Sequence, residues 1–270
     1  MPDPSPRSTA APVRVPGAGS PTLRRLLATG PASGRVLHSS ASAAYVRFGE
    51  GPGNRVVGIV TRQAVHVPCA IATTLAELPE VMVGERVTVH DGRLLLGGLA
   101  VGVDRLVATT TPPMGDPRLA GRQLAAVLPG LDVVRSQLPA AALVALTSGS
   151  AAAVPELVGR GDGLTPVGDD VLAGWLVTTR AAGRPVHAVG TAVLGHLGRT
   201  TDLSATLLAD AVAGASIPQF RAVLLAADTG RELTHAVTEL LSVGHTSGAG
   251  MLLGAALSLT TTPLLERSPR

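Results

Sequence analysis

The hydrophobic pattern of the chain changes its period at the turn-rich segment Thr111–Pro117, TPPMGDP. Before this segment, short runs rich in β-branched residues are separated by Gly, Pro and Asn, which is typical of strands. After it, apolar residues recur at helical spacing, as on one face of an amphipathic helix. The change predicts an α+β fold, with an N-terminal antiparallel β-rich half (a sandwich or small barrel) followed by a mainly α-helical half.

The strands of the first half are expected in short apolar runs, and one pair of runs has a hairpin signature. In Glu85–Leu96, Asp91 and Gly92 suit the positive φ angles of a two-residue type I′ turn, and Val87 and Val89 alternate with polar neighbours. The six expected strand segments are Arg35–Ser40, Ala43–Phe48, Asn54–Thr61, Ala64–Pro68, Glu85–His90 and Arg93–Gly98.

The second half contains segments with a helical stripe. In Arg231–Leu241, for example, Leu233, Val237 and Leu240 follow each other at offsets of four and seven. The expected helices are Arg24–Thr29, Arg118–Leu128, Asp169–Ala182, Asp202–Ala213, Arg231–Leu241 and Gly248–Leu259. Residues 1–20 are rich in Pro, Ser, Gly and Ala, which predicts a disordered leader that folding does not need. The expected organisation is therefore a leader at 1–20, a β-rich subdomain at 21–112 and a helical subdomain at 113–265.

Composition excludes several classes of protein. All 22 basic residues are arginine, the formal net charge is only +3, and aromatic residues make up 1% of the 270 residues. Scattered arginines without stacking aromatics argue against nucleic-acid binding. No apolar run reaches the roughly 18 residues of a membrane span, so no membrane association is expected. The single cysteine, Cys69, forms no internal disulfide, and we expect a cytoplasmic protein with Cys69 buried.

The segment whose residues are most suited to binding or catalysis is the loop Gly161–Asp170, GDGLTPVGDD. Thr165 suits a helix N-cap and Pro166 a first helical position. The following segment, Val171–Thr179, carries no charge, which predicts a buried helix with Asp169 and Asp170 at its start. Such a start binds an anion, or uses the carboxylates for a cation or a substrate N–H. The alternative is a glycine-rich turn whose aspartates only compensate the helix dipole.

Two further helix starts are polar and small. The first runs from Arg199 to Ser204 and the second from Gly244 to Gly250, where His245 lies among glycines. A small anion needs several donors at once, so we expect the starts near Thr165, Thr201 and Ser247 to face one pocket. The alternative is that the polar residues at each helix start only cap their own helix and share no pocket.

These three blocks, GDGLTPVGDDVLAG, RTTDLSATLLADAVAG and GHTSGAGMLLGAAL, resemble in order and content the signature run of the AllH family. The family is named for a subunit linked to oxamate carbamoyltransferase in allantoin catabolism. Its first loop usually reads GPGLTPSGDD, so Asp162 and Val167 depart from the pattern. The resemblance implies transfer of a carbamoyl group between carbamoyl phosphate and a small amide acid such as oxamate, alongside partner subunits.

Three functions remain open at this point. The first is a carbamoyltransferase-type enzyme or subunit with a small anionic substrate and no cofactor. The second is a non-catalytic ligand-binding or scaffolding subunit of a multi-chain complex. The third is a phosphoryl or acyl enzyme in which Asp169 and Asp170 hold Mg²⁺. The expected catalytic residues are Asp169, Asp170 and His245. The expected substrate-binding residues are Gly163, Leu164, Thr165, Gly168, Arg199, Thr200, Thr201, Ser204, Thr246, Ser247 and Gly248.

Overall fold

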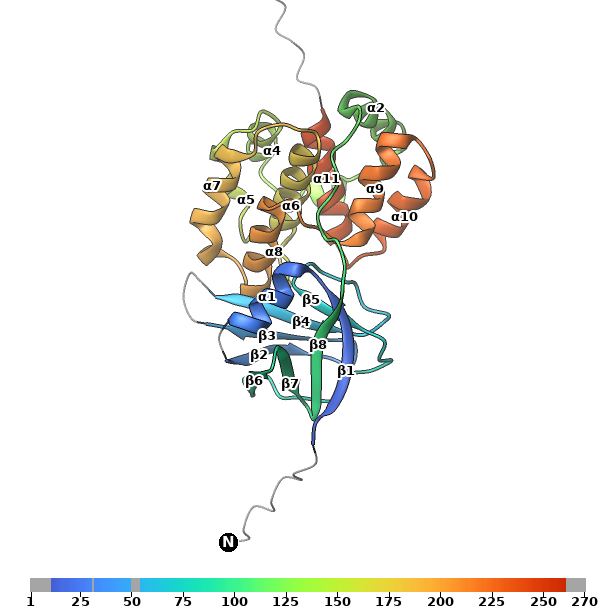
Figure 1. The fold of residues 1–270 in the computed structure, drawn as a ribbon. Helices are drawn as coiled ribbons and strands as arrows, with labels where there is room; N and C mark the ends of the chain where they lie inside the picture. The colour runs from blue at the N-terminus through green and yellow to red at the C-terminus, as the bar shows by residue number, and fades with distance from the viewer. Residues whose placement is uncertain (1–10, 31, 50–53, 261–270) are drawn as a thin grey trace, which may run out of the picture. The chain divides into compact units, whose positions relative to one another are not determined.

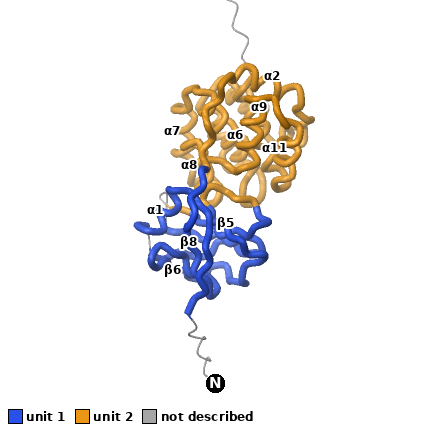
Figure 2. Tube along the Cα trace, turned by 45° about the vertical axis from the view of Figure 1, so that its right-hand side comes forward, with its two compact units in different colours: residues 1–49, 56–64, 70–108 blue, residues 50–55, 65–69, 109–270 orange. Residues whose placement is uncertain are grey.

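The computed structural model of the protein describes residues 11–30, 32–49 and 54–260. The chain divides into two compact units, coloured separately in Figure 2. Residues up to 49, 56–64 and 70–108 form the first unit, and residues 50–55, 65–69 and 109–270 form the second. The second unit therefore includes two short segments that precede residue 112, the expected end of the β-rich part. None of the helices in the described ranges has the length and hydropathy of a membrane span.

The strands of the first unit close into a barrel (Figure 1). In sequence they are β1 (Val13–Gly19), β2 (Ser33–Ser39), β3 (Ala43–Phe48), β4 (Arg55–Val60), β5 (Ala70–Thr73), β6 (Arg86–His90), β7 (Arg93–Leu96) and β8 (Leu99–Leu106). Their order around the barrel is β1-β5-β4-β3-β2-β6-β7-β8. The predicted α+β class is confirmed. The sheet is mixed rather than purely antiparallel, because β1 runs parallel to β8 and β4 runs parallel to β5.

The hairpin predicted within Glu85–Leu96 is confirmed. Strands β6 and β7 pair antiparallel, with His90 opposite Arg93. The two turn residues have positive φ angles, 49° at Asp91 and 69° at Gly92, as a type I′ turn requires. The register of this hairpin therefore follows from its own two turn residues.

The prediction of a disordered leader is wrong for residues 11–20, while residues 1–10 lie outside the described residues. Strand β1 pairs with β5 and with the whole length of β8. Val15 and Ala18 are buried, and Ser20 caps the following helix α1 (Pro21–Thr29) by accepting a hydrogen bond from the Leu23 amide. The glycine and proline content of this segment is typical of flexible chain, but hydrogen bonds to neighbouring strands of the barrel order its backbone.

Aspartate in place of Val15 is expected to destabilise the protein by about 3 kcal/mol or more, because it places a carboxylate in an apolar interior. Val15 is 5% exposed, whereas Val13 in the same strand is 64% exposed. The matched variant Val13→Asp is expected to stay within about 0.5 kcal/mol of the parent. Urea unfolding followed by circular dichroism measures both. Equal losses in the two variants would show that β1 is not part of the stable barrel.

The prediction of a strand at Ala64–Pro68 is also wrong. These residues form an irregular connection between β4 and β5, and residues 65–69 are grouped with the helical unit. Val65 and Val67 alternate as in a strand, but they pack against the apolar core of the helices. The alternation of apolar residues in this segment therefore reflects burial of Val65 and Val67 against the helices, without strand pairing. Cys69, at the end of this segment, is buried as expected, and burial raises the pKa of its thiol.

The second unit is helical, and each predicted helix is present within a few residues. The longer helices are α2 (Pro117–Val127), α4 (Ala140–Thr147), α6 (Val167–Ala181), α7 (His187–His196), α8 (Asp202–Val212), α9 (Pro218–Thr229), α10 (Leu233–Leu241) and α11 (Ser247–Leu259). Single turns are α3 (Asp132–Arg135), α5 (Val154–Leu157) and the 3-10 turns η2 (Ala151–Ala153) and η3 (Leu197–Arg199). The sequence analysis missed α4, α7 and α9.

Helix α6 lies in the interior of this unit, as predicted from its lack of charge, and packs directly on α11 (Figure 1). The contact is made by glycines on both helices. A Cβ added at Gly174 of α6 would overlap the Met251 carbonyl, and one added at Gly254 of α11 would overlap the Val171 carbonyl. Only residues without a side chain let the two backbones approach this closely. This packing places the start of α11 beside the start of α6.

Candidate functional site

The start of α6 differs by one residue from the prediction. The helix begins at Val167, and Pro166 is the N-cap residue, with an extended ψ of 140°. Its carbonyl accepts hydrogen bonds from the amides of Asp169 and Asp170. Thr165 is therefore not the cap, and its hydroxyl is hydrogen-bonded to the Ser247 hydroxyl of α11 at 3.0 Å.

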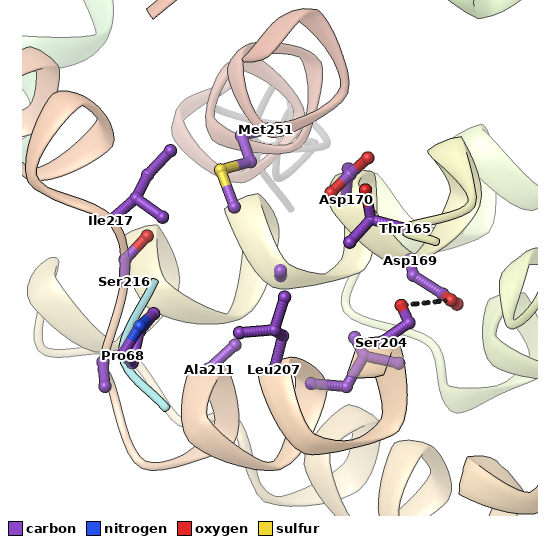
Figure 3. A pocket seen from close by; sticks show the side chains of 13 residues that line it. Pro68, Thr165, Asp169, Asp170, Ser204, Leu207, Ala211, Ser216, Ile217 and Met251 are labelled. Carbon is purple, nitrogen blue, oxygen red and sulfur yellow. Dashed lines mark hydrogen bonds between the residues drawn. The ribbon is translucent and has the colours of Figure 1, made fainter. Parts of the chain in front are cut away.

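The side chain of Asp169 is held by three hydrogen-bond donors. Its Oδ1 accepts from the Gly159 amide at 2.8 Å. Its Oδ2 accepts from the Ser204 hydroxyl at 2.6 Å, drawn in Figure 3, and from the Thr200 hydroxyl. Burial raises the pKa of this carboxyl group, and the three hydrogen bonds lower it. Asp169 thus joins α6 to the start of α8 and to the turn before the motif loop.

The neighbouring Asp170 is equally buried, at 4% exposed, but its surroundings are different. No hydrogen-bond donor among the described residues reaches its Oδ2, which is buried. Burial raises the pKa of Asp170 well above the ordinary aspartate value, a hydrogen bond from Ser247 lowers it, and the charge of Asp169 raises it. A buried polar atom without a partner is rare in folded proteins and points to a missing ligand, proton or water.

Asp170 lies at the polar end of a small cavity in the helical unit (Figure 3). The other polar residues at this end are Thr165, Asp169 and Ser204. The remaining wall is mainly apolar and comes from Ala173 of α6, Leu207, Leu208 and Ala211 of α8, Ile217 before α9 and Met251 of α11. No arginine or histidine lines it. The cavity volume is about 20 Å³, enough for a single water molecule.

The three predicted helix starts meet around the loop Gly161–Pro166. Thr201 caps α8 by accepting from the Ser204 amide, and its hydroxyl donates to the Leu164 carbonyl at 2.6 Å. Thr165 reaches Ser247 at the start of α11, as described above. The loop therefore touches both other helix starts. Most of the polar groups expected to bind substrate are used in these internal contacts.

The expectation that Asp170, Arg199 and His245 border one cavity is not met. Arg199 and His245 are exposed, and neither lines the cavity beside Asp170. Thr246 precedes α11 without a side-chain capping bond. The physical reason is that Arg199 and His245 lie on the outer side of the turns that lead into α8 and α11. Thr200, Ser204 and Ser247 instead face inward, toward the aspartates.

The glycines of the three blocks have two different roles. Added Cβ atoms at Gly168 and Gly248 would overlap the carbonyl oxygens of Leu157 and Leu240, so these two glycines serve helix packing and not ligand approach. Gly163 has a φ of 89° and open space where a Cβ would stand. The adjacent Leu164 is 42% exposed. Of the predicted loop residues, Gly163 and Leu164 are thus the accessible ones.

Sequence reasoning missed the apolar wall of the cavity. Leu207, Ala211, Ile217 and Met251 are ordinary apolar residues, and no local signal separates them from other core positions. Pro68 also lines the cavity and is just over one hundred residues away from Asp170 in sequence. Only the packing of α6, α8 and α11 brings these residues together.

Comparison with known proteins finds one family model that matches part of the chain. Residues 157–259 match the family model described as oxamate carbamoyltransferase subunit AllH. The matched range runs from the end of α5 to the end of α11 and includes both aspartates and all three blocks. No curated protein and no solved structure matches the chain.

Proposed function

We propose that the protein is a carbamoyltransferase-related subunit whose Asp170 binds the carbamoyl or amide group of a small substrate, because residues 157–259 match the AllH family model. The family description names oxamate and carbamoyl transfer, and the sequence resemblance implies carbamoyl phosphate as the donor of the carbamoyl group. The observation that carries the proposal is the buried Oδ2 of Asp170, which has no hydrogen-bond partner among the described residues and belongs to a residue lining a cavity.

Asp170, and not Asp169, is the substrate-binding carboxyl group in this proposal. All the hydrogen bonds that hold Asp169 come from the protein itself, through Gly159, Thr200 and Ser204. A carbamoyl group is planar and offers N–H donors beside a carbonyl acceptor, so it can satisfy a carboxyl group that lacks a partner. Asp169 then acts as the residue that positions the start of α6.

The charge of the cavity decides how a substrate would be oriented. Two carboxyl groups line it and no cationic side chain does, so a phosphate or carboxylate end is not stabilised inside. That end would point outward, toward the exposed loop at Gly163 and Leu164. The groups that stabilise it would come from partner subunits, which agrees with the family being described as a subunit.

The size of the cavity requires a side chain to move before a carbamoyl group fits. Space for one water molecule is too small for three heavy atoms. Met251 extends into this region from α11 (Figure 3). Methionine is unbranched and adapts its shape more readily than other apolar residues. In this proposal Met251 changes rotamer when the substrate enters.

A non-catalytic ligand-binding subunit is the second candidate. The observation in its favour is that no cysteine, histidine or lysine among the described residues lines the cavity and that the Ser204 and Thr165 hydroxyls there are already hydrogen-bonded within the protein. Turnover by the chain alone supports an enzyme, and binding without turnover supports this second candidate.

The magnesium-dependent alternative fits the residues poorly. Both oxygens of Asp169 already accept hydrogen bonds, which leaves only Asp170 to offer a carboxylate oxygen. The described residues contain no group of three acidic, histidine or cysteine side chains arranged to hold a metal. Mg²⁺ prefers six oxygen ligands and keeps much of its water, for which the cavity has no space.

Leucine in place of Asp170 is expected to weaken oxamate and carbamoyl phosphate binding at least about tenfold, because a hydrogen-bonding contact of about 1.4 kcal/mol is lost. Leucine is close to aspartate in shape and suits the apolar wall. Isothermal titration calorimetry measures the affinity, with and without the partner subunits. The matched control is Glu239→Gln in α10, where the side chain is exposed and does not line the cavity, so binding should be unchanged. Unchanged affinity in the leucine variant would refute the site.

A further inference from the structure

We propose that Asp170 is a neutral carboxylic acid in the ligand-free protein and that its Oδ2 hydroxyl donates a hydrogen bond to the carbonyl oxygen of the bound carbamoyl or amide group. The identity of the ligand rests on the proposed function, whereas the protonation state rests on the cavity alone. The inference changes the role of this residue from an acceptor of substrate N–H groups to a donor that recognises and polarises a carbonyl group.

The first argument is the cost of a buried charge. An ionised carboxylate that leaves water needs a cation or several donors to compensate for lost hydration. Asp170 has one donor, Ser247, and the cavity beside it is mostly apolar. Thr165 is hydrogen-bonded to the same Ser247 hydroxyl, so it adds no donor to Asp170. A proton on Oδ2 removes the charge at the atom that lacks a partner.

The second argument is that no neighbouring charge favours ionisation. Asp169 is the other ionisable residue that lines the cavity, and its negative charge opposes a second one. Helix α11 carries no charged residue. The charged or titratable side chains on the other segments around the start of α6 do not line the cavity: Glu156, Arg160, Asp162, Arg199, Asp202, Asp210, His66 and His245.

The two adjacent aspartates therefore differ in protonation state. Asp169 has three donors and keeps the negative charge, while Asp170 has one donor and keeps the proton. Burial raises both pKa values, and it raises that of Asp170 well above the usual range. Environments that separate two carboxyl groups in this way are a common means of placing an acid at neutral pH. The Oδ2–H of Asp170 would then donate to a carbonyl oxygen and draw electron density from the carbonyl carbon.

The sign of the pH dependence distinguishes this proposal from its opposite. If neutral Asp170 donates to a carbonyl, affinity is constant while the group is protonated and falls about tenfold per pH unit above its pKa. If ionised Asp170 accepts a substrate N–H, affinity rises over the same range. Asparagine at this position keeps an N–H donor that does not titrate in this range, so its affinity should not depend on pH.

Two measurements test the inference. Oxamate, whose carboxylate stays ionised throughout, is titrated into the protein and into Asp170→Asn between pH 5.5 and pH 9.5. In the parent we expect affinity that falls toward the alkaline end and rises at no pH, and in the variant a flat profile. Affinity that rises with pH would overturn the inference.

The second measurement needs no ligand. The ¹³C resonance of the Asp170 side-chain carboxyl group, assigned by its loss in Asp170→Asn, reports protonation of the empty protein directly. A protonated group at pH 7 is expected, and an ionised group at pH 7 would overturn the inference even if oxamate binds. Failure of the proposed function gives a different result: oxamate binds at no pH, while the carboxyl resonance still decides whether Asp170 is neutral.

Discussion

Alanine in place of Gly174 is expected to destabilise the protein by more than about 3 kcal/mol, a large part of the 5–15 kcal/mol of a typical domain. The added Cβ would overlap the backbone of Met251, and backbone atoms cannot move aside as a flexible side chain can. Helices α6 and α11 would have to separate, and both would lose contacts along their lengths. Gly254→Ala should have a similar effect, because its Cβ would overlap the Val171 carbonyl.

A third glycine provides the matched control for this prediction. Gly195 also lies in a helix, α7, but open space surrounds the position of its missing Cβ. Gly195→Ala should stabilise the protein by about 0.5 kcal/mol, since alanine restricts the unfolded chain and favours the helix. Thermal and urea unfolding of the three variants measure the difference. A similar, small effect at all three positions would mean that α6 and α11 are farther apart than described.

Alanine in place of Asp169 is expected to cost about 4 kcal/mol, because it leaves the buried donors of Gly159, Thr200 and Ser204 without an acceptor. The loss should include local loosening of the α8 start, visible as faster amide hydrogen exchange of residues near Ser204. Asp169→Asn retains one acceptor oxygen and should lose roughly half as much. A variant as stable as the parent would show that the three hydrogen bonds do not hold the loop.

The adjacent Asp170 is the control for this second prediction, because it is buried to a similar degree in the same helix turn. A pKa raised in the folded state means that the folded protein binds the proton more tightly than the unfolded chain. The corresponding stability is present at acidic pH and is lost as pH rises toward the raised value. Asp170→Asn should therefore unfold at an equal or higher urea concentration than the parent at pH 7, with an advantage that grows with pH.

Local sequence was sufficient for elements whose hydrogen bonds close within one short segment. The turn between β6 and β7 was predictable to the residue, because Asp91 and Gly92 adopt the turn conformation themselves. Helices α8 and α10 were predictable because their apolar spacing repeats along a single segment, and α6 because its start signals and its lack of charge lie within one segment. Strand β1 was not, because its main partner, β8, follows more than eighty residues later. Nothing within residues 13–19 shows that this partner exists.

In the candidate site, too, some features were predictable from local sequence and others depended on the tertiary structure. The sequence by itself determined that two aspartates stand at the start of a buried helix and that two other polar helix starts fall in the range that matches the AllH family model. Only the tertiary structure decided that Asp169 is bound by three donors, while the Oδ2 of Asp170 has none and the residue lines a mostly apolar cavity. It also decided that Arg199 and His245 are exposed. Adjacent residues share their helix but not their surroundings, and burial and hydrogen-bond partners come from segments that are distant in sequence.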